Sequence, residues 1–212
     1  MTKHSETGLD RFLERYAPRM VPRLVFLFSG HMLDKPDRKE ARFPAVSEAA
    51  VRQAIAKTLN QLGAGPSDIG LCGGACGGDL LFAETCLGFG MHLEIHIPFD
   101  EAVFLETSVT FAGGEWGERY RIVRQNPLTR LLAMPDELGD APDGADPYER
   151  NNLWMLSIAL SLGPEKVRLI CLWDEKDGDG PGGTKHMHDE VLKRTGRVFV
   201  LNLHQIVDTF RP

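Results

Sequence analysis

The feature that most constrains the fold is a regular alternation of short apolar runs with longer segments of helical spacing. Five apolar runs are too short for a helix and stop near turn residues, at 24–28, 69–72, 92–99, 167–173 and 198–203. Between them, apolar residues recur at helical spacing over 46–62, 79–87, 100–110, 147–162 and 184–195. This alternation predicts a parallel sheet whose strands are joined by right-handed helical crossovers.

The predicted fold class is therefore α/β, a Rossmann-like three-layer sandwich with a mainly parallel sheet of five strands or slightly more. We expect residues 1–212 to form a single domain of this type, a common length for this class. Residues 112–146 interrupt the rhythm with several glycines and prolines, and we interpret them as a long loop or lid insertion. Helix starts are predicted at Asp146-Pro147, at Asp100 and, as a possible cap, at Ser47.

Composition and charge narrow the range of functions. The net charge is −6, which makes nucleic acid an unfavoured partner because binding to the phosphate backbone needs a basic surface. The N-terminus has no signal-peptide pattern and no stretch is apolar enough to span a bilayer, so a cytoplasmic protein without membrane contact is expected. The four cysteines show no disulfide or zinc pattern, and no metal or other cofactor is predicted.

Three of the predicted strands end in unusual loops, and ligands bind at this edge of open parallel sheets. Glycine lets the backbone approach a ligand closely, and the amides at a following helix N-terminus favour an anion. The candidate ligand-binding residues in the three loops are Ser29, Gly30 and His31; Gly73, Gly74, Gly77, Gly78 and Asp79; and Gly180, Gly182, Gly183 and Thr184.

The loops also allow plainer interpretations. Each glycine-rich loop could simply make a tight turn. The two glycine-rich loops at 73–79 and 178–184 are not Walker A motifs. They also lack the GxGxxG spacing with a following acidic residue, so a standard NAD dehydrogenase is not expected. Asp79 could cap its helix or accept hydrogen bonds from a ribose hydroxyl. Cys76 lies near the same helix N-terminus, which predicts a lowered thiol pKa. Trp173, at a strand end, could belong to the core or stack on a base.

Together these segments resemble the SLOG superfamily, named for the DNA-processing protein Smf/DprA and the Lonely Guy (LOG) proteins, and the motif order is closest to LOG proteins. The similar segments run in the same order along the chain: residues 24–30, "IGLCGGACGGDLLFAE" at 69–84, Ile-Pro at 97–98, "DPYERNN" at 146–152 and "PGGT" at 181–184. The resemblance implies a phosphate site at Gly182, Gly183 and Thr184.

The same resemblance places Arg150 on the catalytic arginine of LOG proteins, with Asn151 where their lysine stands. The family's PGGxGTxxE motif is shortened here, since Thr184 directly follows Gly183 and only Asp189 and Glu190 lie near the position of the glutamate. Arg150, Glu190 and Asp189 are thus the candidate catalytic residues, and Arg150 is also a candidate ligand-binding residue, since its guanidinium could bind a phosphate through two hydrogen bonds. The alternatives are a surface salt bridge for Arg150 and a solvated helix face for the two carboxylates.

LOG proteins split the N-glycosidic bond of nucleoside monophosphates, and other members of the superfamily sense nucleotide-derived signals without turnover. We therefore predict binding or sensing of a nucleotide or nucleotide-derived small molecule, with possible assembly into a homodimer. Hydrolysis of the N-glycosidic bond of nucleoside 5'-monophosphates is the alternative, which leaves the question of enzymatic activity open. A third hypothesis is an interaction module whose pocket has decayed.

Overall fold

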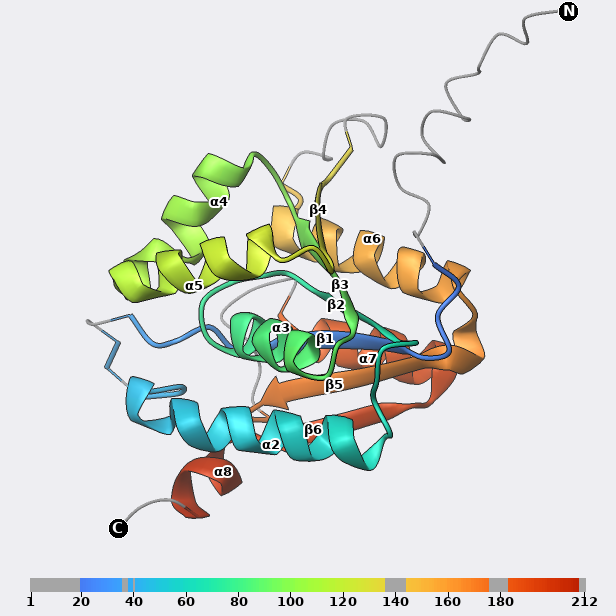
Figure 1. Ribbon diagram of the computed structural model, residues 1–212. Helices are drawn as coiled ribbons and strands as arrows, with labels where there is room; N and C mark the ends of the chain where they lie inside the picture. Colours follow the sequence, from blue (N-terminus) through green and yellow to red (C-terminus); the bar gives the residue numbers. More distant parts are fainter. Residues whose placement is uncertain (1–19, 36–37, 40, 136–143, 176–182, 210–212) are drawn as a thin grey trace, which may run out of the picture.

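The structure is a computed structural model, and it describes residues 20–35, 38–39, 41–135, 144–175 and 183–209. Its centre is a six-stranded sheet in which every pair of neighbouring strands is parallel, in the order β4-β3-β2-β1-β5-β6 (Figure 1). The strands are β1 (Val25–Gly30), β2 (Ile69–Cys72), β3 (His92–Ile97), β4 (Thr129–Ala133), β5 (Val167–Trp173) and β6 (Val198–Asn202). The α/β prediction is confirmed, with one strand more than the five apolar runs.

Strand β1 lies in the middle of the sheet because it can be buried on both faces. Its residues from Val25 to Phe28 have no exposed surface, as expected for a near-continuous apolar run in a parallel sheet. It pairs with β2 on one side and with β5 on the other, where Val25 lies opposite Val167. The chain therefore builds the sheet outward from β1 in one direction and then returns to build it in the other.

The helices cover both faces of the sheet and complete the three layers. One face is covered mainly by α2 (Glu48–Gln61), α3 (Gly78–Gly88) and α5 (Gly114–Gln125), which pack against Phe26 and Phe28. The other is covered by α6 (Pro147–Ser161) and α7 (Thr184–Thr195), which pack against Val25 and Leu27. The remaining helical segments are α4 (Glu101–Ser108), α8 (Leu203–Thr209), η1 (Ala45–Ser47), η2 (Thr110–Ala112) and η4 (Pro164–Lys166).

Two predicted helix starts are confirmed in atomic detail. The Asp100 carboxylate accepts hydrogen bonds from the N–H groups of Ala102 and Val103 at the start of α4. The Asp146 carboxylate accepts from the N–H groups of Tyr148 and Glu149, with Pro147 at the first helical position of α6. Ser47 precedes α2, but its side chain makes no capping hydrogen bond.

The interpretation of 112–146 as a loop or lid is wrong for its first part, because this segment contains α5 and β4. Helix α5 buries Trp116, Tyr120 and Val123, which are spaced four and three residues apart along one face. Strand β4 pairs with β3 and forms one edge of the sheet. Glycines at the start of α5 and Pro127 between the two elements read as loop signals, although they only bound a helix and a strand. Residues 136–143 of the expected loop lie outside the described residues.

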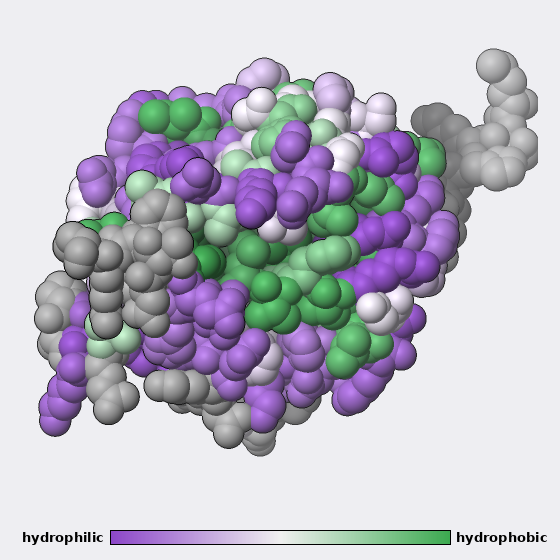
Figure 2. Space-filling model, turned by 90° about the horizontal axis from the view of Figure 1, so that it is seen from below, coloured by the Kyte–Doolittle hydropathy of each residue, from purple (hydrophilic) through white to green (hydrophobic). Residues whose placement is uncertain are grey.

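At the opposite edge of the sheet, β6 exposes part of its apolar surface, and Val200 is 38% exposed. Seen from below, the molecule shows hydrophobic residues gathered across the middle of one face with hydrophilic residues around them (Figure 2). In the described part of the chain no helix combines the length and apolarity needed to cross a membrane.

Candidate functional site

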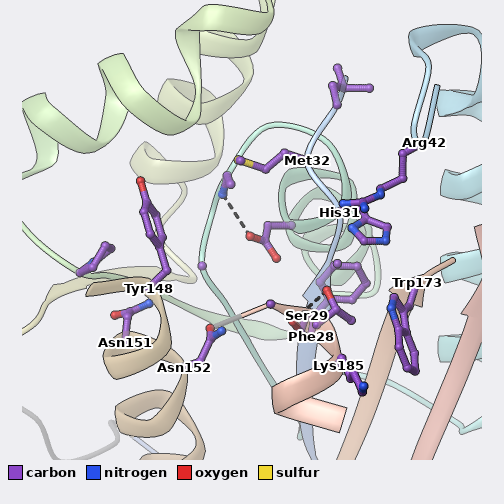
Figure 3. A pocket seen from close by; sticks show the side chains of 18 of the residues that line it. Phe28, Ser29, His31, Met32, Arg42, Tyr148, Asn151, Asn152, Trp173 and Lys185 are labelled. Atoms are coloured by element: carbon purple, nitrogen blue, oxygen red, sulfur yellow. Dashed lines mark hydrogen bonds between the residues drawn. The ribbon is translucent and has the colours of Figure 1, made fainter. Parts of the chain in front are cut away.

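The site lies where the order of the sheet changes direction. The chain passes from β1 to β2, β3 and β4 on one side and then to β5 and β6 on the other, so the carboxyl ends of β1 and β5 flank a crevice that no crossover covers. A pocket of about 660 Å³ opens there. Figure 3 shows Ser29, His31, Trp173 and Lys185 along one side of the pocket and Tyr148, Asn151 and Asn152 of α6 on the other.

On the side of the pocket formed by Ser29, His31, Trp173 and Lys185, the end of β1 lies against the start of α7. Ser29 is 9% exposed and Thr184 is 7% exposed, and both line the pocket. Their hydroxyl oxygens are 3.5 Å apart, at the long limit of a hydrogen bond (Figure 3). Two buried hydroxyls joined only weakly leave capacity for a further hydrogen-bonding partner in the pocket.

Three helices begin at the pocket, and their N-termini differ in charge. Helix α3 carries Asp79 in its first turn, and α6 is capped by Asp146. Helix α7 has neither a side-chain cap nor an acidic residue in its first turn, where Thr184 is followed by Lys185. Because a helix N-terminus is partially positive, α7 presents the start most suited to an anion.

Asp79 turns its carboxylate back onto the glycine-rich turn that precedes α3. Its Oδ2 accepts a hydrogen bond from the N–H of Ala75 at 3.3 Å. Burial raises the pKa of Asp79 to about 7, while hydrogen bonds from the backbone at Ala75 and Gly73 oppose the rise. The pocket wall therefore contains a carboxyl group that changes charge near neutral pH.

The wall nearest β5 is organised by Asp174, a residue that the sequence analysis did not single out. Its Oδ1 lies 3.1 Å from Nε2 of His31, and its Oδ2 lies 3.1 Å from Nε of Arg42. The side chain of Asp174 is 3% exposed, whereas His31 and Arg42 both line the pocket. Burial lowers the pKa of His31; Asp174 offsets part of this decrease and Arg42 adds to it.

The rest of the lining is largely apolar and aromatic. Besides Trp173, which also contacts the ring of His188 at 5.4 Å between centroids, it contains Phe28, Phe104, Phe111 and Tyr148. Lys35, Arg38 and Lys185 bring further positive charge to the wall. An apolar pocket with a few polar groups at its base is the usual form of a small-molecule site.

The pocket gathers seven of the predicted ligand-binding residues: Ser29, Gly30, His31, Gly73, Asp79, Gly183 and Thr184. They come from three strand ends that are far apart in the sequence. Gly180 and Gly182 lie outside the described residues.

Gly74, Gly77 and Gly78 do not line the pocket, and each has a structural reason in the packing of the turn. Gly77 has φ +95°, and a Cβ there would lie 2.7 Å from the backbone nitrogen of Leu33. Gly74 has φ +77°, and a Cβ would meet Ile95 at 2.6 Å. Gly78 donates its N–H to the carbonyl of His31 at 3.1 Å. The close backbone approach at these glycines is between two segments of the protein itself.

The candidate catalytic residues do not meet in the pocket. Arg150, Asp189 and Glu190 are absent from its described lining. Glu190 is paired with Lys193 and Arg194 along the outer turns of α7, which lowers its pKa. Asp189 lies 2.9 Å from Nδ1 of His188. A position within the first turns of a helix does not fix which face the side chain occupies. The residues of α6 that line the pocket, Tyr148, Asn151, Asn152 and Met155, lie on either side of Arg150 in the sequence.

Asn151 is one of these residues, and it stands at the position of the LOG lysine. It is 3% exposed, and its Nδ2 donates to the carbonyl oxygen of His96 at 2.8 Å. Its Oδ1 has no hydrogen-bond partner among the described residues. A buried amide oxygen without a donor is unfavourable, so a ligand donor at this position would stabilise the site.

Metal and thiol chemistry receive no support from the geometry. Within the described ranges, no group of three or more His, Cys, Asp and Glu residues is placed to hold a metal ion. All four cysteines are free and buried. The expectation of a lowered pKa for Cys76 is wrong: burial raises the pKa of this thiol to about 12. Desolvation outweighs the nearby helix N-terminus, because the thiol is packed in the core beneath the turn.

No family model and no curated protein matches the chain. Among solved structures, the Moco carrier protein from Chlamydomonas reinhardtii is similar at 11% identity and a TM-score of 0.34, covering 89% of this chain and 99% of that one. DNA processing protein A (DprA) from Streptococcus pneumoniae is similar at 12% identity and a TM-score of 0.35, and the match covers 90% of this chain and 62% of the DprA chain.

Proposed function

We propose that this protein binds a small phosphorylated molecule with an aromatic ring, of the nucleotide class, in the pocket between the ends of β1 and β5. The observation that carries the proposal is the start of α7. Of the three helix N-termini at the pocket, it is the one with neither an acidic N-cap nor an acidic residue in the first turn, and it lies against the buried hydroxyls of Ser29 and Thr184. This combination suits a phosphate group, which accepts hydrogen bonds and carries negative charge.

The remainder of the pocket supports a ring attached to that phosphate. Aromatic side chains, among them Trp173 and Tyr148, line its walls, and planar rings stack favourably on such surfaces. Asn151 and Asp79 add acceptor oxygens that suit the N–H or O–H groups of a base or sugar. The volume of about 660 Å³ lies within the range of small-molecule sites.

Binding without rapid turnover is the form of this function that we propose. Neither carboxylate of α7 that could replace the LOG glutamate lies in the described lining, and Glu190 is held by two cationic partners. Without a carboxylate against the ribose, the positive charge that develops when an N-glycosidic bond breaks is not stabilised by this helix. Incubation with adenosine 5'-monophosphate should therefore release little free base. Rapid release that is lost in Glu190→Ala would contradict this part of the proposal.

The binding test is calorimetric titration with adenosine 5'-monophosphate, adenosine and inorganic phosphate. The monophosphate should bind at least about tenfold more tightly than adenosine, because hydrogen bonds to charged groups contribute about 1.5–3 kcal/mol. Thr184→Val removes the hydroxyl at nearly constant volume and should reduce this preference. Arg150→Ala is the matched control, a cationic residue one helix away that does not line the pocket. Equal affinity for nucleotide and nucleoside, or a larger effect of Arg150→Ala than of Thr184→Val, would refute the proposal.

A further inference from the structure

The imidazole of His31 is held at the pocket wall by one of its two nitrogens. Among the described residues, its Nε2 faces Oδ1 of Asp174 at 3.1 Å and also lies 3.4 Å from the backbone nitrogen of Asp174, whose N–H donates to it. In the neutral ring, Nε2 either accepts from this N–H or, when it carries the hydrogen, donates to the carboxylate. In the protonated ring both nitrogens carry hydrogens, so Nε2 donates to Asp174 and Nδ1 is a second N–H donor.

His31 is also close to the proposed phosphate position. Its backbone N–H donates to the carbonyl oxygen of Leu172 at 3.2 Å, which continues the pairing of β1 with β5 by one residue. Residues two apart along a strand share a face, so His31 lies on the same side as Ser29, which contacts Thr184 at the start of α7. Figure 3 shows the side chains of Ser29 and His31 on the same side of the pocket.

The charges around the ring determine what a proton on His31 would do. Asp174 from β5 and Arg42 from the segment after β1 form an ion pair that is close to neutral as a unit. Arg38 from the same segment adds positive charge toward the ring, although it is itself paired with Asp34 at 3.4 Å. Asp34 and Lys35 also line the pocket. Lys185 from α7 and Asp79 from α3 line the same pocket. With His31 neutral, the pair with Asp174 supplies little net charge to a ligand, and protonation adds one full positive charge.

We propose that His31 makes the site selective for a terminal phosphate, a dianionic monoester, by taking up a proton when such a ligand binds. This inference rests on the proposed function. The energy between two charges scales with their product, so a dianion stabilises the protonated ring about twice as strongly as a monoanion in the same place. A phosphodiester, which keeps a single charge, gains less from the same residue. Linkage requires that a ligand that favours protonated His31 also binds more tightly as the pH falls.

The experiment measures proton uptake directly. Adenosine 5'-monophosphate and its phosphate methyl ester are titrated calorimetrically at pH 7 and 8 in buffers of different ionisation enthalpy, which gives the number of protons bound with the ligand. The monoester itself titrates near a pKa of about 6, so its own contribution is small at pH 8. The wild-type protein should take up a proton fraction with the monoester that exceeds the fraction with the methyl ester, and should prefer the monoester about tenfold.

Variants separate His31 from the other groups. His31→Gln keeps an N–H donor toward Asp174 but cannot be protonated, so it should retain the fold, lose the excess proton uptake and reduce the preference for the monoester to about twofold. Asp79→Asn removes the other group of the pocket that titrates near neutrality and should leave the difference between monoester and methyl ester in place. Unchanged proton uptake or unchanged preference in His31→Gln overturns the inference. If the wild-type protein binds neither nucleotide, the proposed function itself fails.

Discussion

The turn before α3 and the start of α7 are both glycine-containing links from a strand to a helix at one edge of the sheet, yet the protein uses them differently. In the turn before α3, Gly74 and Gly77 allow other segments of the chain to pack closely, and Asp79 satisfies a backbone amide. At the start of α7, the N-cap residue is Gly183, which has no side chain to cap the helix, and the hydroxyls of Ser29 and Thr184 face the pocket. Glycine alone therefore does not mark a ligand site, and the proposed phosphate site is at the helix start whose N-cap residue supplies no acceptor side chain.

The largest expected effect tests the structural role of the turn before α3. Gly77→Ala should lower the free energy of unfolding by about 4 kcal/mol, because a positive φ and a clash with the backbone each cost about 1–3 kcal/mol. Urea denaturation followed by circular dichroism measures the loss. Gly88→Ala is the matched control in the same helix, since a Cβ there meets no atom within 4 Å. A loss of less than about 1 kcal/mol in Gly77→Ala would mean that the turn relaxes easily.

The second prediction concerns the carboxyl group of that turn. The pKa of Asp79 in the folded protein, about 7, lies above its ordinary value of 3.8, so the folded state binds this proton more tightly than the unfolded state. Its contribution to stability is thus present below pH 3.8 and is lost as the pH rises through 7.

Asp79→Asn mimics the protonated acid and should remove this pH dependence. We expect it to be more stable than the wild type by up to about 4 kcal/mol at pH 8 and similar to it at pH 4, as measured by denaturation at both pH values. A variant less stable than the wild type at pH 8 would show that Asp79 serves the turn as a carboxylate, through its hydrogen bonds, more than burial penalises it.

The smallest effect on stability is expected from adding an acidic N-cap to α7 and removing the acidic N-cap of α6. Gly183→Asp places a cap on α7, where the backbone has φ −71° and ψ 175°, an extended conformation like that of Asp146 before α6. It should stabilise the protein by up to about 1 kcal/mol and reduce affinity for adenosine 5'-monophosphate at least about tenfold. Asp146→Ala should destabilise by about 1 kcal/mol without weakening nucleotide binding. A Gly183→Asp variant that binds as the wild type does would separate α7 from the phosphate site.

Much of the fold could be predicted from local sequence alone. The strand Val167–Trp173 and the helix Thr184–Thr195 have the bounds that their patterns indicate, because Gly183 and Gly196 flank the helix and apolar residues fill the strand. Of the missed elements α5 and β4, helix α5 has a usable signal in the spacing of Trp116, Tyr120 and Val123. The glycines and prolines at the ends of the two elements outweighed that signal. Such residues stand at the boundaries of helices and strands as well as within loops.

The candidate site was predictable in position but not in its charged residues. The strand-end residues Ser29, Gly30 and Thr184 follow from the rule for parallel sheets. Asp174 and Arg42 do not, because an ion pair between segments 132 positions apart leaves no spacing in the sequence. The resemblance to LOG proteins favours Arg150 over Asn151, but the rotation of α6 decides which of two adjacent residues faces the pocket.

The central place of β1 also has a consequence for how the protein folds. Its pairing with β5 joins Val25 to Val167 across most of the chain, whereas β1 to β4 pair between consecutive strands. Closing so long a segment is entropically unfavourable and slow, so the β1–β5 contact is expected to form late. A folding intermediate with only the first four strands would hold one wall of the pocket, with Ser29 and Gly73, and lack the wall formed by Trp173 and Thr184. Ligand in a refolding reaction would then leave the early phases unchanged and stabilise only the final state.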